Sequence, residues 1–173
     1  MKTALLGSAI GLLFVFLSCG PSGPGGLKPI AAPDASTPCP AGRKVWRLEV
    51  LDRRAERRES GRVSELVADS IRRSFPGCAW DNASPDAPLI TIEIAAFSST
   101  YSYEGGAGMW DAEAIWTVLA RDPSGRTLTE FECNASASRP NYRDSNNELM
   151  LLNQIFEQAL GRAVAGLREI PPF

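Results

Sequence analysis

Cys19 is the residue of this chain best placed to do chemistry, because it closes a charged and then apolar run typical of export and lipid attachment. Lys2 precedes an apolar stretch from Ala4 to Leu17, and the small residue Ser18 stands directly before the cysteine. The apolar stretch is too short to span a bilayer and is typical of a cleaved secretory signal. If cleavage occurs before Cys19, we expect its thiol to carry lipid. An ordinary secretory signal with a cysteine near its cut site is the alternative.

The residue after Cys19 helps to predict whether a lipidated chain is sorted to the inner or the outer membrane. Gly20 stands there in place of an aspartate. By the sorting rule of enterobacteria, this choice favours export to the outer membrane. Three acyl chains on one cysteine would exceed the two lipid signals that stable anchoring takes. We therefore expect a chain that is lipid-anchored to the bacterial outer membrane and faces the periplasm.

Side chains suited to catalysis are sparse. The chain has no histidine, which removes the commonest general base and the commonest ligand of transition metals. Asp111 and Glu113 lie two residues apart, a spacing that puts both carboxylates on one face of a strand, and they suggest a carboxylate-dependent hydrolase as one hypothesis. No nucleophile, metal cluster or pocket accompanies them in the sequence. We expect solubilising charges here, and a non-enzymatic protein with no metal and no cofactor.

A cluster of arginines is the first candidate for a binding surface. Its members are Arg53, Arg54, Arg57, Arg58 and Arg62. We expect them between a strand and a helix, where the helix dipole also favours anions. Guanidinium groups suit bidentate binding of phosphate and carboxylate. The cluster therefore predicts a binding module for anionic lipid or glycan, or contact with an acidic protein partner. A solvated loop whose charge is offset by Asp52, Glu56 and Glu59 is the alternative.

Large side chains gather around a glycine run and form the second candidate. Tyr101, Tyr103, Met109 and Trp110 flank the segment Gly105-Gly106-Ala107-Gly108. Aromatic residues and methionine are enriched at protein interfaces. We expect the glycines to form a mobile loop that contacts a partner or a membrane surface. A loose hairpin whose aromatic rings pack on their own sheet is the alternative.

Apolar residues on a second sheet face form the third candidate. Phe97, Ile115 and Leu119 alternate away from the residues expected in the core. They would then lie on the solvent-facing side of the sheet, where an apolar patch often marks an interface. Two alternatives remain open: the core face is assigned wrongly, or the tether covers the patch.

Composition divides the chain into three parts. Residues 1–18 are expected to be a lipoprotein signal peptide, 19–43 the lipidated Cys19 with a Gly/Pro-rich tether, and 44–173 a single α+β domain. Glycine and proline prevent the tether from keeping a helix or a β-ladder. Removing 18 of the 173 residues leaves 155, which is enough for one domain with a sizeable core.

Hydrophobic periodicity predicts the elements of that domain. Alternation of apolar and polar residues predicts strands over 45–51, 89–103, 110–121 and 127–135, with a short one at 78–80. Helical spacing predicts a helix over 63–75 and a longer closing helix, which begins at the capping box of Ser145 and Glu148 and runs to Pro171. Two helices with one apolar face each most simply cover one sheet face. We expect an α+β, two-layer fold: a mixed β-sheet of four to five strands with two helices on one face, in the order β-α-β-β-β-β-α.

That topology bears on the three cysteines beyond Cys19. An exported chain can form a disulfide, and the absence of a C-x-x-C pair argues against zinc. The first helix returns toward the start of the first strand, so Cys39 and Cys78 should meet at one end of the sheet. Cys133 falls on the inward-facing set of its strand. We favour a Cys39–Cys78 disulfide, with Cys78–Cys133 as the alternative.

The order of these features carries a resemblance. An exported cysteine and a Gly/Pro tether precede the stretches Val45–Asp52 and Trp116–Arg126 and an amphipathic closing helix. Together they resemble a class of small bacterial envelope lipoproteins. This class includes the lipopolysaccharide-assembly lipoprotein LptE, the auxiliary lipoproteins of ABC-type envelope transporters and the lipoproteins of the YajG type. The resemblance implies a non-catalytic partner of an envelope complex.

The net charge argues against nucleic acid as a partner. The chain has 18 basic and 20 acidic residues, a formal net charge of −2, whereas nucleic-acid binders normally carry a basic excess. We therefore expect no nucleic acid. The expected partners are an envelope protein complex, of assembly or transport, and the membrane that holds the lipid anchor.

Overall fold

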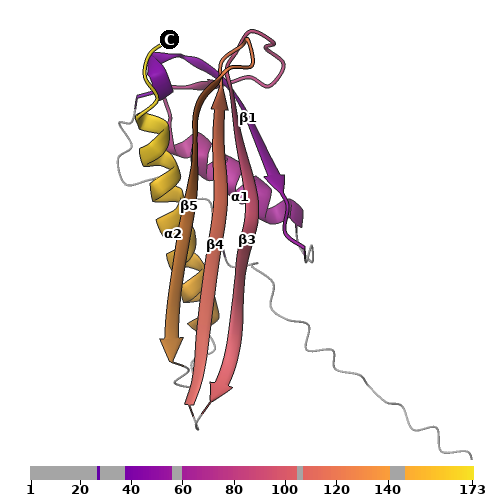
Figure 1. Cartoon of the computed structure of the whole chain (residues 1–173), viewed down its shortest axis with the longest axis vertical. Helices are drawn as coiled ribbons and strands as arrows, with labels where there is room; N and C mark the ends of the chain where they lie inside the picture. Colours follow the sequence, from indigo (N-terminus) through magenta and orange to yellow (C-terminus); the bar gives the residue numbers. More distant parts are fainter. Residues whose placement is uncertain (1–26, 28–37, 56–59, 105–106, 141–146) are drawn as a thin grey trace, which may run out of the picture.

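The computed structural model describes residue 27 and residues 38–55, 60–104, 107–140 and 147–173. Cys19 and most of the tether lie outside these residues. The elements are, in chain order, a 3-10 turn η1 (Pro40–Gly42), β1 (Val45–Asp52), α1 (Ser60–Ser74), β2 (Ala79–Trp80), β3 (Leu89–Glu104), β4 (Ala107–Arg121), β5 (Thr127–Pro140) and α2 (Asn147–Arg168) (Figure 1). Within the described residues, no helix has the length and apolar character needed to cross a membrane.

The five strands form one mixed sheet in the order β2-β1-β3-β4-β5. β1 is parallel to β2 and β3, and the pairs β3–β4 and β4–β5 are antiparallel. Both helices lie behind the sheet in Figure 1, α1 against β1 and α2 against β4 and β5. The predicted α+β fold, with its mixed sheet, two helices on one face and order of elements, is confirmed.

The core fills the space between that sheet face and the two helices. Inward-facing side chains of β3 and β4, such as Ile92 and Trp116, are fully buried. On α2, the ring of Phe156 lies edge-on to Trp116, with ring centroids 5.6 Å apart. Each large apolar side chain buried in this way stabilises the fold by about 1.5–3 kcal/mol. The alternation that predicted the strands therefore also identified the core face.

A β-bulge in β3 corrects one predicted position. The register between β3 and β4 shifts between Ile94 and Ala96, so that Phe97 lies opposite Ala114. The extra residue reverses the alternation of the strand beyond it. Phe97 is consequently buried on the core face, 4% exposed, and its ring packs against Phe156. The prediction that Phe97 lies on the solvent-facing side of the sheet was wrong.

The hairpin between β3 and β4 is longer than predicted. β3 runs to Glu104 and β4 begins at Ala107, so Ala107 and Gly108 belong to a strand and the predicted four-residue glycine loop does not form as such. Gly105 and Gly106 lie outside the described residues. β5 also continues past the predicted end, to Pro140. The antiparallel part of the sheet is therefore long and narrow (Figure 1).

The tight turn between β4 and β5 is organised by one carboxylate. Asp122 Oδ1 accepts hydrogen bonds from the backbone N–H of Ser124 (2.9 Å) and of Arg126 (3.0 Å). The Ser124 hydroxyl also donates to it, and this bond is the largest cause that holds the pKa of Asp122 below its usual value. Gly125 completes the turn with a positive φ of 87°, which glycine adopts without strain.

Candidate functional site

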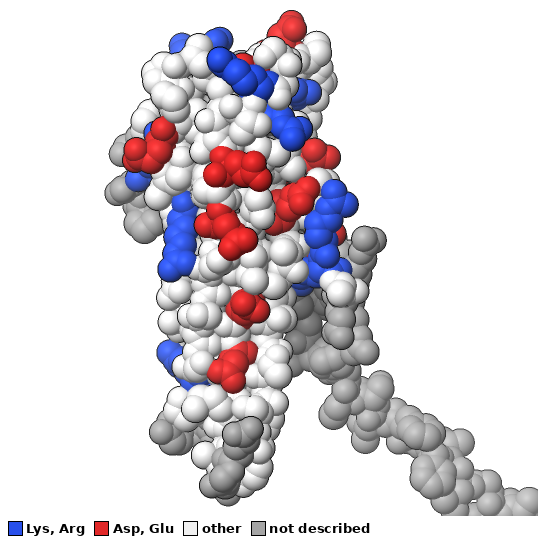
Figure 2. All heavy atoms as spheres, in the orientation of Figure 1, with Lys and Arg blue, Asp and Glu red and all other residues white. Residues whose placement is uncertain are grey.

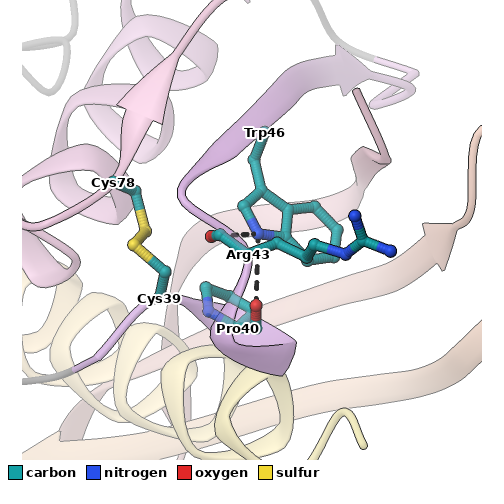
Figure 3. Close-up of a disulfide and its surroundings, with 5 residues drawn as sticks. All are labelled: Cys39, Pro40, Arg43, Trp46 and Cys78. Atoms are coloured by element: carbon teal, nitrogen blue, oxygen red, sulfur yellow. Dashed lines mark hydrogen bonds between the residues drawn. A yellow bond between two sulfur atoms is a disulfide. The ribbon is translucent and has the colours of Figure 1, made fainter. Parts of the chain in front are cut away.

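A disulfide fixes the point at which the tether enters the folded domain. Cys39 and Cys78 are bonded, with Cα atoms 5.4 Å apart (Figure 3). α1 brings Cys78 back to the end of the sheet where β1 begins, which is the physical reason the two cysteines meet. Cys133 is buried and free. The predicted Cys39–Cys78 pairing is confirmed.

Trp46 holds the same segment through hydrogen bonds. Its indole Nε1 donates to the backbone oxygens of Pro40 (3.2 Å) and Arg43 (3.1 Å) (Figure 3). The side chain is fully buried, and it lies on β1, so it ties η1 directly to the first strand. The end of the predicted tether is therefore held against the first strand by both hydrogen bonds, in addition to the disulfide.

Phe173 closes over this segment from the far end of the described chain. Arg43 Nη2 donates to the backbone oxygen of Phe173 (2.7 Å), and its guanidinium carbon lies 4.8 Å from the centroid of the Phe173 ring. That ring also packs edge-on against Trp46. Sequence reasoning missed this contact, because residues 130 positions apart leave no local pattern. We call the group Cys39, Pro40, Arg43, Trp46, Cys78 and Phe173 the tether clasp.

The hairpin of β3 and β4 projects from the opposite end of the sheet (Figure 1). Glu148, in the first turn of α2, accepts a hydrogen bond from Ser99 (2.7 Å), so β3 residues past Ser99 extend beyond the start of the helix. A strand of 15 residues such as β4 is about 50 Å long at about 3.3 Å per residue. The end of the hairpin therefore lies far from the tether clasp.

Four predicted interface residues lie at this end, Tyr101, Tyr103 and Trp110 on the helix-facing side of the hairpin and Met109 on the opposite side. We call these four residues the hairpin tip. The Tyr101 ring packs across the strands against Trp110, with ring centroids 5.1 Å apart and the ring planes tilted by 51°. Tyr103 is 67% exposed, Tyr101 43% and Met109 38%. The Tyr101 ring lies over Gly108, where a Cβ would collide with its hydroxyl. The strands thus hold in place aromatic groups that the sequence placed around a mobile loop.

The solvent-facing side of the sheet combines apolar and acidic side chains. Ile115 and Leu119 are half-buried on this side. Their neighbours along β4 point to the core face and are fully buried: Ala114, Trp116, Val118 and Ala120. The strands also place six carboxylates on this side: Glu49, Glu93, Asp111, Glu113, Glu130 and Glu132. Figure 2 shows acidic groups along the length of the strands. We call this surface the acidic face.

The arginines of the cluster that lie in the described residues have separate surroundings. Arg54 is occupied by Asp52, with Nη2 2.8 Å from Oδ2 and Nε 2.9 Å from Oδ1, and its Nη1 donates to the backbone oxygen of Phe97 (3.2 Å). Arg53 forms an exposed ion pair with Glu93 (3.6 Å). Arg62 is exposed on α1. Arg57 and Arg58 lie outside the described residues.

The two acids of the hydrolase hypothesis lie on the acidic face. Asp111 accepts a hydrogen bond from the Ser138 hydroxyl (2.5 Å), and Glu113 is exposed. Two surface grooves occur elsewhere: one between β1 and α1, and one beside the bulge of β3; neither is lined by these acids. Among the described residues, no three His, Cys, Asp or Glu side chains are grouped to hold a metal ion.

No protein-family model matches the chain, and no curated protein matches it. Several solved structures are similar to it at low identity. A minor lipoprotein from Acinetobacter baumannii shares 12% identity at a TM-score of 0.49, over 74% of this chain and 94% of that one. The hypothetical protein CT253 from Chlamydia trachomatis shares 13% at 0.48, over 74% and 97%.

The lipoprotein GNA1162 from Neisseria meningitidis is the third, with 12% identity at a TM-score of 0.41, over 72% of this chain and 99% of that one. Two of these three similar structures are therefore bacterial lipoproteins.

Proposed function

We propose that the chain is a lipid-anchored, non-enzymatic docking module of the bacterial envelope. Cys19 holds it to the outer membrane on the periplasmic side, and the folded domain contacts a protein of an envelope assembly or transport complex. The export and lipid-attachment pattern that ends at Cys19 supports the anchor, and the geometry of the domain supports the docking.

The observation that carries this proposal is the placement of the tether clasp and the hairpin tip at opposite ends of one sheet (Figure 1). The tether enters the domain at Cys39, where a disulfide and buried hydrogen bonds fix it. The exposed aromatic side chains lie at the other end. A domain that is attached to the membrane at one end would present its other end to proteins located away from the membrane surface.

The hairpin tip has the chemistry of a protein contact. Tyrosine and tryptophan supply large contact areas for the loss of few rotatable bonds, which is why they dominate binding energy at interfaces. Tyr101 and Trp110 already pack on one another, so less side-chain freedom remains to be lost on binding. The acidic face beside the tip would steer a partner with basic groups and raise its association rate.

Charged substitutions at the tip test the docking. We expect Tyr103→Asp combined with Met109→Asp to reduce the partner recovered with the affinity-purified protein from detergent-solubilised membranes at least tenfold, because a carboxylate would be desolvated at the contact. Val45→Asp is the matched control. Val45 is as exposed as Met109, 39% against 38%, but lies near the tether clasp. Equal recovery from the tip variant and the control would contradict docking through the tip.

The anchor is tested separately by mass spectrometry of the mature N-terminus. We expect a chain that begins at Cys19 and carries acyl groups on that residue. A chain cleaved at another position, or an unmodified Cys19, would contradict the anchor whatever the tip variants show.

A further inference from the structure

The outer edge of β1 is only partly covered by β2. Two residues form the pairing, Ala79 opposite Val45 and Trp80 opposite Trp46. The chain then turns away, while β1 continues to Asp52. Beyond Trp46, this edge has no neighbouring strand among the described residues, and an open strand edge is a template for pairing with another chain.

The side chain of Asn82 stands in for the missing strand at one position. The Leu48 N–H donates to Oδ1 of Asn82 (2.9 Å), and Asn82 Nδ2 donates to the Leu48 oxygen (3.1 Å). A side-chain amide offers the same donor and acceptor as a peptide group. The edge of β1 therefore already binds an amide in the manner of a β-ladder.

The next position along that edge is Val50. In a parallel sheet, successive residues of a strand direct their backbone groups to opposite edges. Arg47 and Arg53 donate their N–H groups to carbonyl oxygens on the β3 side, at 2.8 and 2.9 Å, so Val50 between them faces the outer edge. No described residue bonds the Val50 N–H or oxygen there.

A groove of about 430 Å³ runs beside Val50, between the β1 edge and α1. Its lining residues are Leu48, Val50, Ser64, Glu65, Ala68, Asp69 and Arg72. Val50 and Ala68 are half-buried at the margin of the core and form an apolar floor. The groove therefore combines an open backbone edge with a surface on which one side chain of an added strand could pack.

The α1 wall of the groove carries an acidic group without a counter-charge. Asp69 is paired with Arg72 (3.1 Å), which leaves Glu65 as a carboxylate with no ion-pair partner in the part of the chain described. Glu65 is exposed. A basic side chain that enters the groove would complement this charge.

We propose that this groove binds an extended segment of a partner polypeptide, which pairs with β1 at Val50 as an added strand and directs a lysine or arginine toward Glu65. In such strand addition, main-chain hydrogen bonds supply affinity and alternate side chains supply specificity. The groove lies on β1 and α1 and shares no residue with the hairpin tip, so it stands independently of docking through the tip.

Selection from random dodecapeptides displayed on phage tests the proposal. The target is the full-length protein in detergent micelles, and binders to Val50→Pro are removed beforehand. Proline at an edge position removes only the outward N–H and leaves the β1–β3 ladder intact. Peptides enriched on the wild-type protein are expected to contain lysine or arginine within an alternating apolar pattern.

A synthetic copy of an enriched peptide then separates strand addition from other binding. We expect Val50→Pro and Glu65→Lys each to weaken its binding at least tenfold, while Glu157→Lys on the exposed side of α2 and the tip variant Tyr103→Asp leave it unchanged. Bound peptide should slow hydrogen exchange of the Val50 amide. If Val50→Pro does not fold, Ala68→Trp, which fills the groove, takes its place.

Two results would overturn the proposal. One is a failure to enrich any peptide on the wild-type protein over Val50→Pro or Ala68→Trp. The other is a bound peptide that leaves exchange of the Val50 amide unchanged. Neither result depends on the hairpin tip, so failure here and failure of the docking proposal are distinguishable.

Discussion

At the scale of single residues, Cys133 shows how its surroundings set the chemistry of a side chain. Burial raises the pKa of its thiol to about 11, with a further increase from Glu132 and an opposing effect from Arg162. The thiolate is the reactive form of cysteine. In the folded chain Cys133 is therefore a small core residue, in agreement with its place on the inward-facing set of β5.

The raised pKa of Cys133 predicts a loss of stability in alkali. The unfolded thiol ionises near its ordinary value of 9.0, whereas the folded one keeps its proton to about 11. The unfolded state therefore binds fewer protons across this window, and stability falls as pH rises through it, by on the order of 2 kcal/mol. Urea unfolding at pH 8 and pH 10.5 measures the fall. The Cys133→Ala variant should lack the part of this fall in stability that the thiol causes. An equal fall in both proteins would contradict a contribution from Cys133.

The disulfide of the tether clasp makes a larger contribution. It joins residues 39 positions apart, and closing a loop of this length stabilises a fold by about 4 kcal/mol in the chain-entropy account. We expect the Cys39→Ser, Cys78→Ser double variant to unfold at a correspondingly lower urea concentration. Treatment of the wild-type protein with a reductant should reproduce the shift. Identical midpoints with and without reductant would show that the bond does not stabilise the domain.

At the scale of elements, the strands were predictable because apolar and polar residues alternate along them. Features that depend on contacts between distant residues were not predictable. The isoleucines of β3 and the alternation around Trp116 identified both the strands and the core face. The bulge near Ala95 could not be predicted, because an extra residue is recognised only against the partner strand. The same reason explains why the sequence placed a loop at Ala107 and Gly108, whose pairing with β3 makes them part of a strand.

The candidate site, too, was predictable only where the order of the elements determines the contact. The Cys39–Cys78 bond follows from topology, since a returning helix brings both residues to one end of the sheet. The ion pair of Arg54 with Asp52 agrees with the alternative that the sequence left open, in which Asp52 offsets the arginine charge. The bond from Arg54 to the Phe97 oxygen joins residues 43 positions apart and has no local signature. Phe173 over Arg43 is likewise a contact between distant parts of the chain.

Packing of α2 on β5 gives a prediction with a built-in control. Gly166 lies where an added Cβ would collide with the Phe131 ring, whereas Gly161 on the same helix has open space around it. Gly161→Ala should stabilise the protein by about 0.5–1 kcal/mol through helix propensity. Gly166→Ala should destabilise it by about 1–3 kcal/mol, as overpacking does. Thermal unfolding compares the two; equal effects would contradict the close approach.

At the scale of the whole molecule, the fold places the tether clasp and the hairpin tip at opposite ends of one sheet (Figure 1). The tether clasp holds the N-terminal side of the domain at one end of the sheet, and β4 carries the hairpin tip to the other end, about 40 Å along the strand from Arg121 to Met109 at about 3.3 Å per residue. The acidic face extends along the same strands (Figure 2). In the proposed docking, attachment and contact lie at opposite ends, so that a partner would reach the tip while the lipid remains in the membrane.

The most direct test of this account is photo-crosslinking in living cells, with a photoreactive amino acid in place of Tyr103 and, as the control, in place of Val45. The account predicts a discrete protein adduct from position 103 that is absent from position 45, and that is lost when Cys19→Ala removes the anchor. Equal adducts from both positions, or none from position 103, would contradict it.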